Sequence, residues 1–403
     1  MPEVNKYSYY QKKWRPFGTN QIYQGSGSIE VIPEILELEG WKRVMIVADP
    51  GVVKFGGIKP IEDMLKKAGI EYCMFTNIEP NPLQESIEKE AIPMYREFKA
   101  DVMIAVGGGS TMDSAKGVAI VGESDLNIKE ASNSVMPDQK MPYKTYPIIA
   151  VPTTCGTGSE VIRNAVISEP NGHKLVPMQN CILPDYAICD PDLLASIPPH
   201  VAAATAMDAL VQAVESYVSL AANDFSETMS LRAIELIGEC IRPYYHNRSI
   251  KKWANMMSLG CMYAGIAWNT SFIAQIHGSN HPITEILHIS HGDACAILFP
   301  IFVEWNGFVC KDKFFKVYNL LCPEHPVKRS EFEIKMLVDE LVQLNRDLNI
   351  LNGKSMADYG CTEETVDKML EEFPENGKPS FPRTTTKAQM KEIFMRVMNG
   401  EFL

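Results

Sequence analysis

The chain has 403 residues, and its 38 Lys and Arg against 50 Asp and Glu give a formal net charge of −12. Hydrophobic residues make up 46% and charged residues 22%, which is typical of a globular protein and excludes a disordered chain, a collagen-like repeat and a coiled coil. The acidic balance argues against nucleic acid or an anionic membrane as a partner, because both require a basic surface, and it favours small-molecule ligands.

The cysteines and the N-terminal segment indicate the compartment. Ten cysteines are scattered along the chain without a C-x-x-C pair, which is typical of reduced, mostly buried thiols. The segment MPEVNKYSYYQKKWRPF lacks the apolar stretch of a signal peptide, and no run of about 18 apolar residues suggests a membrane span. We therefore expect a cytoplasmic protein.

Short apolar runs alternate with helical patterns in the first half of the chain. The runs, each closed by Gly, Pro, Asp or Thr, cover residues 43–48, 71–75, 102–106 and 147–151. They predict buried strands joined by right-handed βαβ crossovers, and so a largely parallel sheet.

Asp49 ends the first of these strands. A carboxylate at this position could accept hydrogen bonds from an adenosine ribose and would repel a 2′-phosphate, which favours NAD(H) over NADP(H). The alternative is ordinary turn chemistry before Pro50 and Gly51.

A glycine-rich turn, GGGSTMDSAKG, follows the third strand. It contains Gly107, Gly108, Gly109 and Ser110. Because glycine has no Cβ, this turn would let a phosphate approach backbone N–H groups at the positive end of a helix. The alternative is a tight turn in which Ser110 is the N-cap and Asp113 its capping-box partner.

A second polar turn, PTTCGTGSEV at 152–161, follows the next strand. Hydroxyl groups and flexible backbone at two adjacent strand ends suit a ligand that carries both a pyrophosphate and sugar hydroxyls. A dinucleotide carries both.

Strand patterns stop near Asp190, in a stretch rich in Pro and Asp at 189–199. Patterns with a period near 3.6 follow at 199–219, 224–242 and 330–349 and predict helices. We therefore expect an α/β domain of residues 1–190 and an all-helical domain of residues 191–403, with the ligand site in the cleft between them.

The helical half holds two groups of polar residues with metal-ligand chemistry. Asp208 and Gln212 share one face of an apolar helix, where the carboxylate needs a metal cation or a hydrogen bond as its partner. Four of the eight histidines, His277, His281, His288 and His291, fall within HGSNHPITEILHISH. This density favours metal binding or proton transfer, and a roughly helical chain would place them on one face, although Pro282 disfavours a continuous helix.

Together these motifs resemble the iron-containing (group III) alcohol dehydrogenase family. The resemblance is carried, in order and spacing, by GGGSTMDSAKG, PTTCGTGSEV, MDALVQAVESYVS at 207–219 and the H-x3-H-x9-H-G segment that ends at Gly292. Weaker matches are CDPDLL at 189–194 and FPRTTTKAQM at 381–390, so the resemblance spans nearly the whole chain.

The resemblance implies a Rossmann-like dinucleotide-binding domain followed by an all-α domain, the architecture shared with dehydroquinate synthase. It implies cofactor contacts from Asp49, Gly107, Gly108, Gly109, Ser110, Asp113, Thr153, Thr154, Thr157, Ser159 and Lys174. It implies metal ligands at Asp208, His277 and His291, with His281 beside the nicotinamide.

One position departs from the family pattern. The family usually has a histidine four residues after the metal-binding aspartate, and this chain has Gln212. An amide oxygen is a weaker and harder donor than imidazole, so metal affinity should fall. Gln212 could bind through its oxygen, water could take the position, or the metal could be lost. We expect a divalent metal to be retained, Fe²⁺ first, with Zn²⁺ or Mn²⁺ as alternatives.

The expected activity is NAD(H)-dependent, metal-assisted interconversion of a short-chain aldehyde and its primary alcohol by a homodimer or larger homo-oligomer. The enzyme alternatives are a dehydroquinate-synthase-like lyase, a glycerol-dehydrogenase-like enzyme and a reductase of an anionic aldehyde, a carboxylate, phosphonate or sulfonate, with Arg163 as a candidate anchor. A nucleotide-binding protein with a decayed metal site is the non-enzymatic alternative.

Overall fold

The computed structural model describes residues 20–135, 139–371, 373–378 and 380–402. They form two compact units, one ending at Ser196 and the other beginning at Ile197. The predicted boundary lay after Asp190, six residues before the observed one. The difference arises because the segment that follows Asp190 packs with the first unit. The Asp190 carboxylate accepts a hydrogen bond from the backbone N–H of Ile29, and Asp192 accepts one from the hydroxyl of Ser26.

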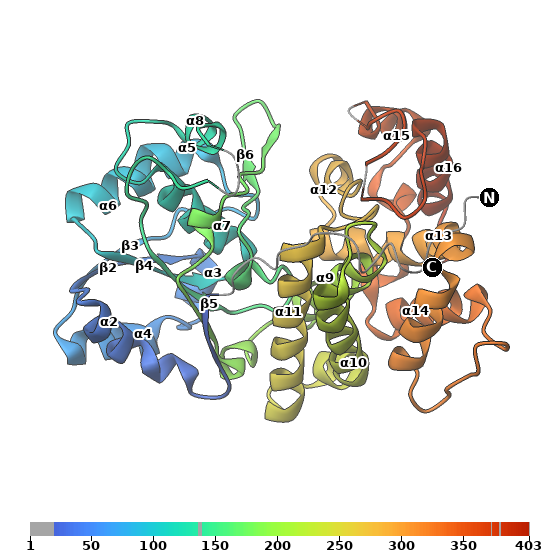
Figure 1. Ribbon diagram of the computed structural model, residues 1–403, viewed down its shortest axis with the longest axis horizontal. Helices are drawn as coiled ribbons and strands as arrows, with labels where there is room; N and C mark the ends of the chain where they lie inside the picture. The colour runs from blue at the N-terminus through green and yellow to red at the C-terminus, as the bar shows by residue number, and fades with distance from the viewer. Residues whose placement is uncertain (1–19, 136–138, 372, 379, 403) are drawn as a thin grey trace. The chain divides into compact units, whose positions relative to one another are not determined.

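The first unit is built on a six-stranded parallel sheet with the order β1-β8-β5-β4-β2-β3 (Figure 1). Its strands are β1 (Gln21–Gln24), β2 (Arg43–Ala48), β3 (Glu71–Phe75), β4 (Val102–Gly107), β5 (Ile148–Pro152) and β8 (Tyr186–Cys189). A separate antiparallel hairpin consists of β6 (Ile167–Ser168) and β7 (Lys174–Leu175). The predicted parallel α/β sheet is confirmed, and four of its six strands coincide with the apolar runs.

Helices cover both faces of this sheet (Figure 1). They are α2 (Ile32–Glu39), α3 (Pro50–Lys54), α4 (Lys59–Ala68), α5 (Gln84–Ser86), α6 (Ile92–Phe98), α7 (Gly109–Val121) and α8 (Ile128–Asn133). The continuous apolar runs are explained by this layering, because successive strand residues point to opposite covered faces. Val44 and Ile46 join the core cluster on the side of α2 and α4, whereas Met45 and Val47 join the cluster on the side of α6 and α7.

The register of the sheet brings the carboxyl ends of its central strands to one level. Ala48 pairs with Val106, which pairs with Val151, and Gly107 pairs with Pro152. The chain reverses its direction of travel across the sheet between β2 and β4, which is where open parallel sheets bind ligands.

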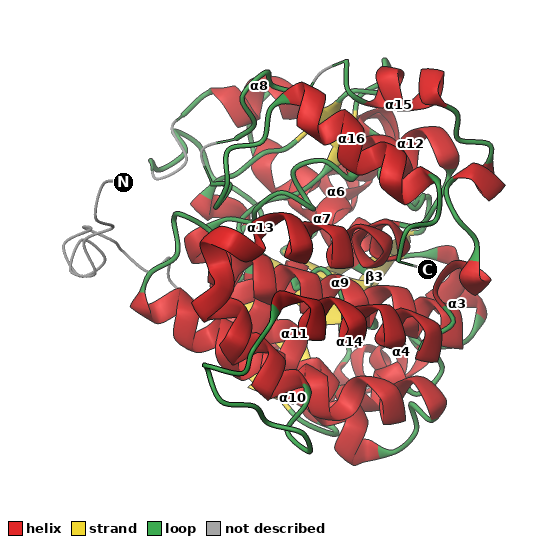
Figure 2. Ribbon diagram, turned by 90° about the vertical axis from the view of Figure 1, so that its right-hand side faces the viewer, coloured by secondary structure: helices red, strands yellow, loops and turns green. Residues whose placement is uncertain are grey.

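The second unit is helical (Figure 2). Its helices are α9 (Pro199–Val218), α10 (Asp224–His246), α11 (Lys251–Ser271), α12 (His281–Leu287), α13 (His291–Leu321), α14 (Ile334–Asp347), α15 (Glu363–Met369) and α16 (Lys387–Met398). The three predicted helices correspond to α9, α10 and α14, and α9 packs against α10, α11 and α13 at the centre of the unit. An all-helical second half is therefore confirmed.

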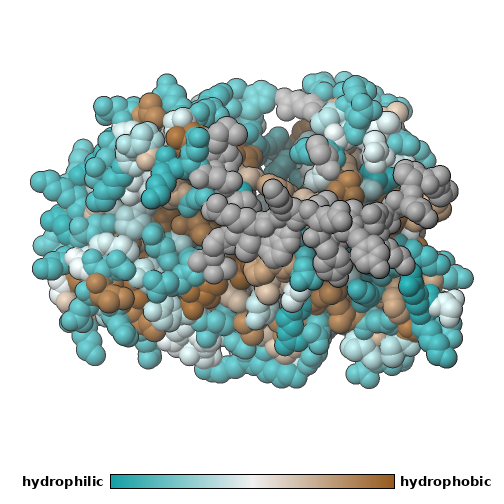
Figure 3. All heavy atoms as spheres, in the orientation of Figure 1, coloured by the Kyte–Doolittle hydropathy of each residue, from teal (hydrophilic) through white to brown (hydrophobic). Residues whose placement is uncertain are grey.

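Among the described residues, α13 is the one helix long and apolar enough to cross a membrane. However, 72% of its most apolar window is buried within the protein. Hydrophilic side chains cover much of the surface that is visible in Figure 3. The buried residues of α13, among them Phe299 and Phe302, contribute to the core of the helical unit. That burial is typical of a core helix.

Candidate functional site

Asp49 stands at the carboxyl end of β2, directly beside the glycine-rich turn. Its Oδ1 accepts a hydrogen bond of 2.9 Å from the backbone N–H of Val52, so it is the N-cap of α3. Its Oδ2 lies 3.0 Å from the point where a Cβ on Gly107 would be. The structure therefore brings together two of the predicted cofactor residues, and the turn alternative for Asp49 is also realised.

Close packing explains the glycines of the turn. A Cβ at Gly107 would lie 2.2 Å from Thr111 Oγ1, and one at Gly109 would lie 2.7 Å from Thr157 Cγ2. At Gly108 the nearest atom, Thr154 Oγ1, is 3.2 Å away. The carboxyl ends of β2, β4 and β5 thus lie together, with the backbone of the turn against hydroxyl-bearing side chains. We call this group the strand-end cluster; it consists of Asp49, Gly107, Gly108, Gly109, Thr111, Thr153, Thr154 and Thr157.

Ser110 and Asp113 do not form the capping box that was the alternative interpretation of this turn. Helix α7 begins at Gly109 with Gly108 as its N-cap, and no side chain caps it. Ser110 Oγ donates to Pro80 O instead, and Asp113 accepts from Ser159 Oγ at 3.0 Å. The capping box is wrong because both side chains are engaged by segments distant in sequence.

Asp113 belongs to a buried network that the sequence did not indicate. Its second oxygen accepts from the backbone N–H of Val166, and burial raises the pKa of its carboxyl. Lys116, one turn later on α7, has no exposed surface, and its ammonium donates to Ser159 O, Ser159 Oγ and Asn164 O. Burial lowers the pKa of Lys116 to about 8. This network anchors α7 to the loop after β5.

The remaining predicted cofactor residues lie in different surroundings. Thr153 is buried and donates its backbone N–H to Gly107 O, so it belongs to the strand-end cluster. Lys174 lies on β7 of the separate hairpin and donates to Ser168 Oγ. Arg163, the candidate anion anchor, is buried and donates to Asn180 Oδ1. Its guanidinium is therefore engaged within the protein.

The helical unit contains a cluster of metal-ligand type, which we call the donor cluster; three of its four residues are buried and His291 is partly exposed. It consists of Asp208 on α9, His277 between α11 and α12, His291 at the start of α13 and Cys295 one turn later. The four ligand atoms all lie within 4.8 Å of one another. The sequence predicted three of these residues.

The contacts within the donor cluster are short. Asp208 Oδ1 is 3.0 Å from His277 Nε2 and 3.5 Å from His291 Nε2. Cys295 Sγ is 3.9 Å from Asp208 Oδ1, 3.9 Å from His277 Nε2 and 3.8 Å from His291 Nε2. Four different donor atoms therefore face a common centre.

The electrostatics of the donor cluster favour bound positive charge. Burial alone would raise the pKa values of Asp208 and Cys295, but the imidazoles of His277 and His291 outweigh it and lower both. Conversely, burial would lower the pKa values of the two histidines, and the neighbouring acidic groups raise them. A divalent cation would supply that positive charge while the imidazoles stay neutral, so the donors present fit such an ion.

The chain that carries the four clustered histidines is not one continuous helix. His277 lies in a turn, α12 ends after Leu287, and α13 begins at His291. His288 is exposed and adopts a left-handed backbone conformation (φ 54°) that breaks the helix. His281 begins α12, and its ring centroid lies 5.8 Å from that of His291, beside the donor cluster.

Two further residues, Gln212 and Glu215, lie on α9 with Asp208. Gln212 is buried on α9 one turn after Asp208, as the spacing predicts. Cys295 was missed because it resembled a small buried apolar residue, although its position four residues after His291 is a ligand spacing. Glu215 was also missed. Its Oε2 lies 2.7 Å from His277 Nδ1, and its spacing of seven residues from Asp208 places both on one face of α9.

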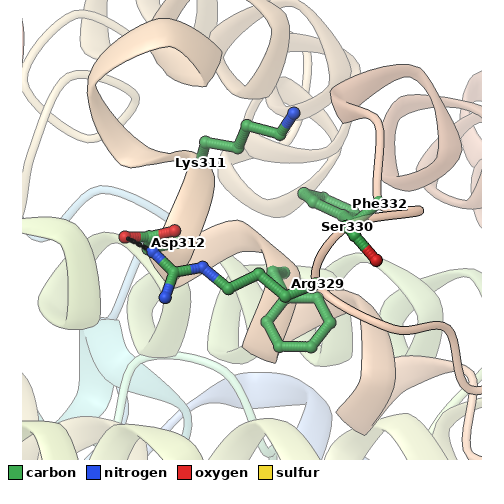
Figure 4. A pocket seen from close by; sticks show the side chains of 6 residues that line it. Lys311, Asp312, Arg329, Ser330 and Phe332 are labelled. Atoms are coloured by element: carbon green, nitrogen blue, oxygen red, sulfur yellow. Dashed lines mark hydrogen bonds and ion pairs between the residues drawn. The ribbon is translucent and has the colours of Figure 1, made fainter.

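A pocket elsewhere in the helical unit has a lining that differs from the donor cluster in its chemistry (Figure 4). It is lined by Lys311, Asp312, Phe315, Arg329, Ser330 and Phe332. Lys311 is 16 residues beyond Cys295 on α13, about 24 Å along the helix axis. The guanidinium of Arg329 is paired with Asp312, and the pocket lining holds no metal-ligand cluster, so the donor cluster remains the candidate site.

Comparisons with known proteins match both units. The model of the iron-containing alcohol dehydrogenase family matches residues 19–191, and the C-terminal model of the Fe-containing alcohol dehydrogenase family matches residues 202–398.

Individual relatives match most of the chain. The protein is 32% identical over 349 residues to long-chain-alcohol dehydrogenase 1 of Geobacillus thermodenitrificans, covering 86% of this chain and 87% of that one. It is 29% identical over 394 residues to the NADPH-dependent butanol dehydrogenase of Clostridium saccharobutylicum, covering 94% and 96%. The structure of an alcohol dehydrogenase from Oenococcus oeni matches with a TM-score of 0.87 at 30% identity, covering 96% of this chain and all of that chain.

Proposed function

Because the chain belongs to the iron-containing alcohol dehydrogenase family, we propose that this oxidoreductase interconverts a short-chain aldehyde and its primary alcohol with NAD(H) and a divalent metal. The observation that carries the proposal is the donor cluster. A buried carboxylate, two imidazoles and a thiol converge within 4.8 Å in the helical unit, next to a further histidine.

Asp208, His277 and His291 would hold the metal. When bound, a divalent cation supplies Lewis acidity, which polarises a carbonyl oxygen or lowers the pKa of an alcohol. Glu215 fixes the ring of His277 with Nε2 toward the cluster, since the carboxylate lies against Nδ1. Asp208 and His277 are buried and His291 is partly exposed, so charge at the first two residues is poorly screened by water.

The strand-end cluster would hold the cofactor. A nicotinamide cofactor supplies or accepts the hydride when bound. The backbone of Gly108, Gly109 and Ser110, at the start of α7, offers N–H groups for the pyrophosphate, and the positive end of the helix favours that anion. Asp49, which is partly exposed at the end of β2, would accept from the ribose and repel a 2′-phosphate. We therefore propose NAD(H) as the preferred cofactor, although one relative is named as NADPH-dependent.

His281 would move the proton. It begins α12 and is partly exposed, while its ring lies 5.8 Å between centroids from the ring of His291. A titratable ring with one side toward the donor cluster and partial access to solvent can transfer a proton between the two.

The cysteines support a reducing compartment. All ten are free, and the majority are buried. We propose a cytoplasmic enzyme that works as a homodimer or larger homo-oligomer.

The proposal is tested by measuring oxidation of NADH and NADPH with a panel of neutral aldehydes from acetaldehyde to hexanal and with anionic aldehydes of similar length. We expect turnover of neutral aldehydes, with NADH preferred. His277→Ala should abolish turnover while NADH binding remains measurable by fluorescence. Steady NADH oxidation by His277→Ala, or cofactor binding without turnover over the whole panel, would overturn the proposal.

A further inference from the structure

The donor cluster contains a thiol that the family resemblance did not predict. Cys295 Sγ is buried and within 4 Å of a ligand atom on each of Asp208, His277 and His291. Its place on α13 explains this position, because residues four apart share one face of a helix and His291 precedes it by four.

Five of the six distances between the four ligand atoms lie close to the edges of a coordination tetrahedron, and the sixth, between the ring nitrogens of His277 and His291, is within 4.8 Å. Metal–ligand bonds of about 2.0–2.3 Å to oxygen, nitrogen and sulfur imply ligand atoms about 3.3–3.8 Å apart in a tetrahedral zinc site. The five separations given above run from 3.0 to 3.9 Å. Of these five, the three that involve Cys295 Sγ are the longest, as expected for sulfur with its longer bond.

Asn280, a neighbour of the thiol, favours metal binding by Cys295. Asn280, which has no exposed surface, lies with Nδ2 2.9 Å from Cys295 Sγ and donates to it. A hydrogen bond to sulfur stabilises the thiolate, which is the form that binds metals.

The charge of the ligand set also favours the thiol. The carboxylate and the thiolate together carry two negative charges, so a divalent cation bound with neutral imidazoles leaves the ligand set uncharged. A set completed by the neutral amide of Gln212 would keep a positive charge.

We propose that Cys295, and not Gln212, is the fourth protein ligand of the metal, and that the resulting Asp208–His277–His291–Cys295 set selects Zn²⁺ over Fe²⁺. Thiolate is a soft donor that favours zinc, whereas the amide oxygen of Gln212 is a hard one. Four protein ligands leave the site usable, because catalytic zinc can expand to five-coordinate. The inference rests on the proposed metal site but makes no use of turnover.

The test uses Co²⁺ as a probe bound to the metal-free full-length protein. A thiolate ligand gives bound Co²⁺ an intense near-ultraviolet charge-transfer band, and imidazole or carboxylate ligands do not. We expect the band in the wild type at one Co²⁺ per chain, its loss in Cys295→Ser, and its retention in Gln212→Leu. Cys310→Ser, which changes another buried cysteine of α13, is the matched control and should keep the band.

Metal selectivity is the second readout. Loss of an outer-shell partner lowers metal affinity by about 10–100-fold, so Cys295→Ser should weaken Zn²⁺ binding at least that much. Its effect on Fe²⁺ affinity should be smaller. If stoichiometric Co²⁺ binds the wild type without the band, or if the band survives in Cys295→Ser, the inference is wrong.

Failure of the inference is distinguishable from failure of the proposed function. An enzyme that reduces aldehydes but binds Co²⁺ without the thiolate band contradicts only the ligand assignment. A protein that shows the band and selects Zn²⁺, but turns over no aldehyde or alcohol, supports the ligand assignment and contradicts the activity. Thermal unfolding of each variant shows whether a lost band reflects a lost ligand or a lost fold.

Discussion

Glu215 Oε2 lies 2.7 Å from Nδ1 of His277, on the side of the ring opposite the contact between Nε2 and Asp208. The same carboxylate accepts hydrogen bonds from the backbone N–H groups of Ile276 and His277. It thus fixes both the ring and the turn that carries it. A histidine ligand held in this way keeps one tautomer, with Nε2 available for the metal.

Glu215→Gln should therefore weaken metal binding without unfolding the protein. The amide is nearly isosteric but cannot accept from all three N–H groups, and its own N–H₂ is repelled by them. We expect a loss of about 10–100-fold in Zn²⁺ affinity, measured by competition with a chromophoric chelator. An affinity equal to that of the wild type would show that Glu215 does not orient the ligand.

Asp49→Asn tests the predicted cofactor preference. Asparagine can still accept from Val52 N–H and cap α3, so the change removes mainly the negative charge. Repulsion of a 2′-phosphate by a nearby carboxylate is worth about 1–2 kcal/mol, or about tenfold. The ratio of kcat/KM for NADPH to that for NADH should rise by about this factor, and an unchanged ratio would remove Asp49 from the cofactor site.

Gly107→Ala tests the packing of the glycine-rich turn. The new Cβ would lie 2.2 Å from Thr111 Oγ1 and 2.7 Å from Thr111 Cβ, so backbone or helix must move. We expect a loss of about 1–3 kcal/mol in the free energy of unfolding, together with weaker NADH binding. Gly108→Ala, with its nearest contact at 3.2 Å, is the matched control and should lose less stability. Equal stability of the two variants would contradict this account.

Glu160→Gln tests the electrostatics of the loop after β5. Burial raises the pKa of the Glu160 carboxyl from 4.5 to about 7. Between these values the folded state binds more protons than the unfolded state, so stability falls as pH rises through the window. At about pH 4–5 the variant and the wild type should have the same free energy of unfolding. Above about pH 7 the free energy of unfolding of the variant should be higher, by up to about 3 kcal/mol.

Chemical unfolding of both proteins at several pH values measures this difference, in which the titration of all other groups largely cancels. A constant difference across the pH range would show that Glu160 does not become charged at a cost to the fold.

The fold was predictable where burial on two faces leaves a continuous apolar run. The central strands of the sheet are such runs, and alternate residues such as Met45 and Ile46 supply the two cores. The edge strand β1 and its neighbour β8, of four residues each, were not individually predicted. Strand β1 has no buried residue, so it lacks the continuous apolar signal.

The site was predictable to the extent that the family motifs carry it. Asp208, His277 and His291 converge as expected, although the chain between the histidines is broken at His288. Cys295 was not predicted as a site residue, because a single cysteine in an apolar helix has the pattern of a core residue. Ser110 and Asp113 had the spacing of a capping box, but contacts with residues distant in sequence, Pro80 and Ser159, determine their role.

The central claim is that the donor cluster, loaded with a divalent metal, makes this chain an aldehyde reductase. The most direct measurement is NADH oxidation with butanal, together with the amount of butanol formed, for protein stripped by a chelator and then reloaded with Zn²⁺ or Fe²⁺. We predict no turnover in the stripped protein and, after reloading, one butanol per NADH consumed. Full activity in the stripped protein, or no activity after stoichiometric reloading of the folded protein, would contradict the claim.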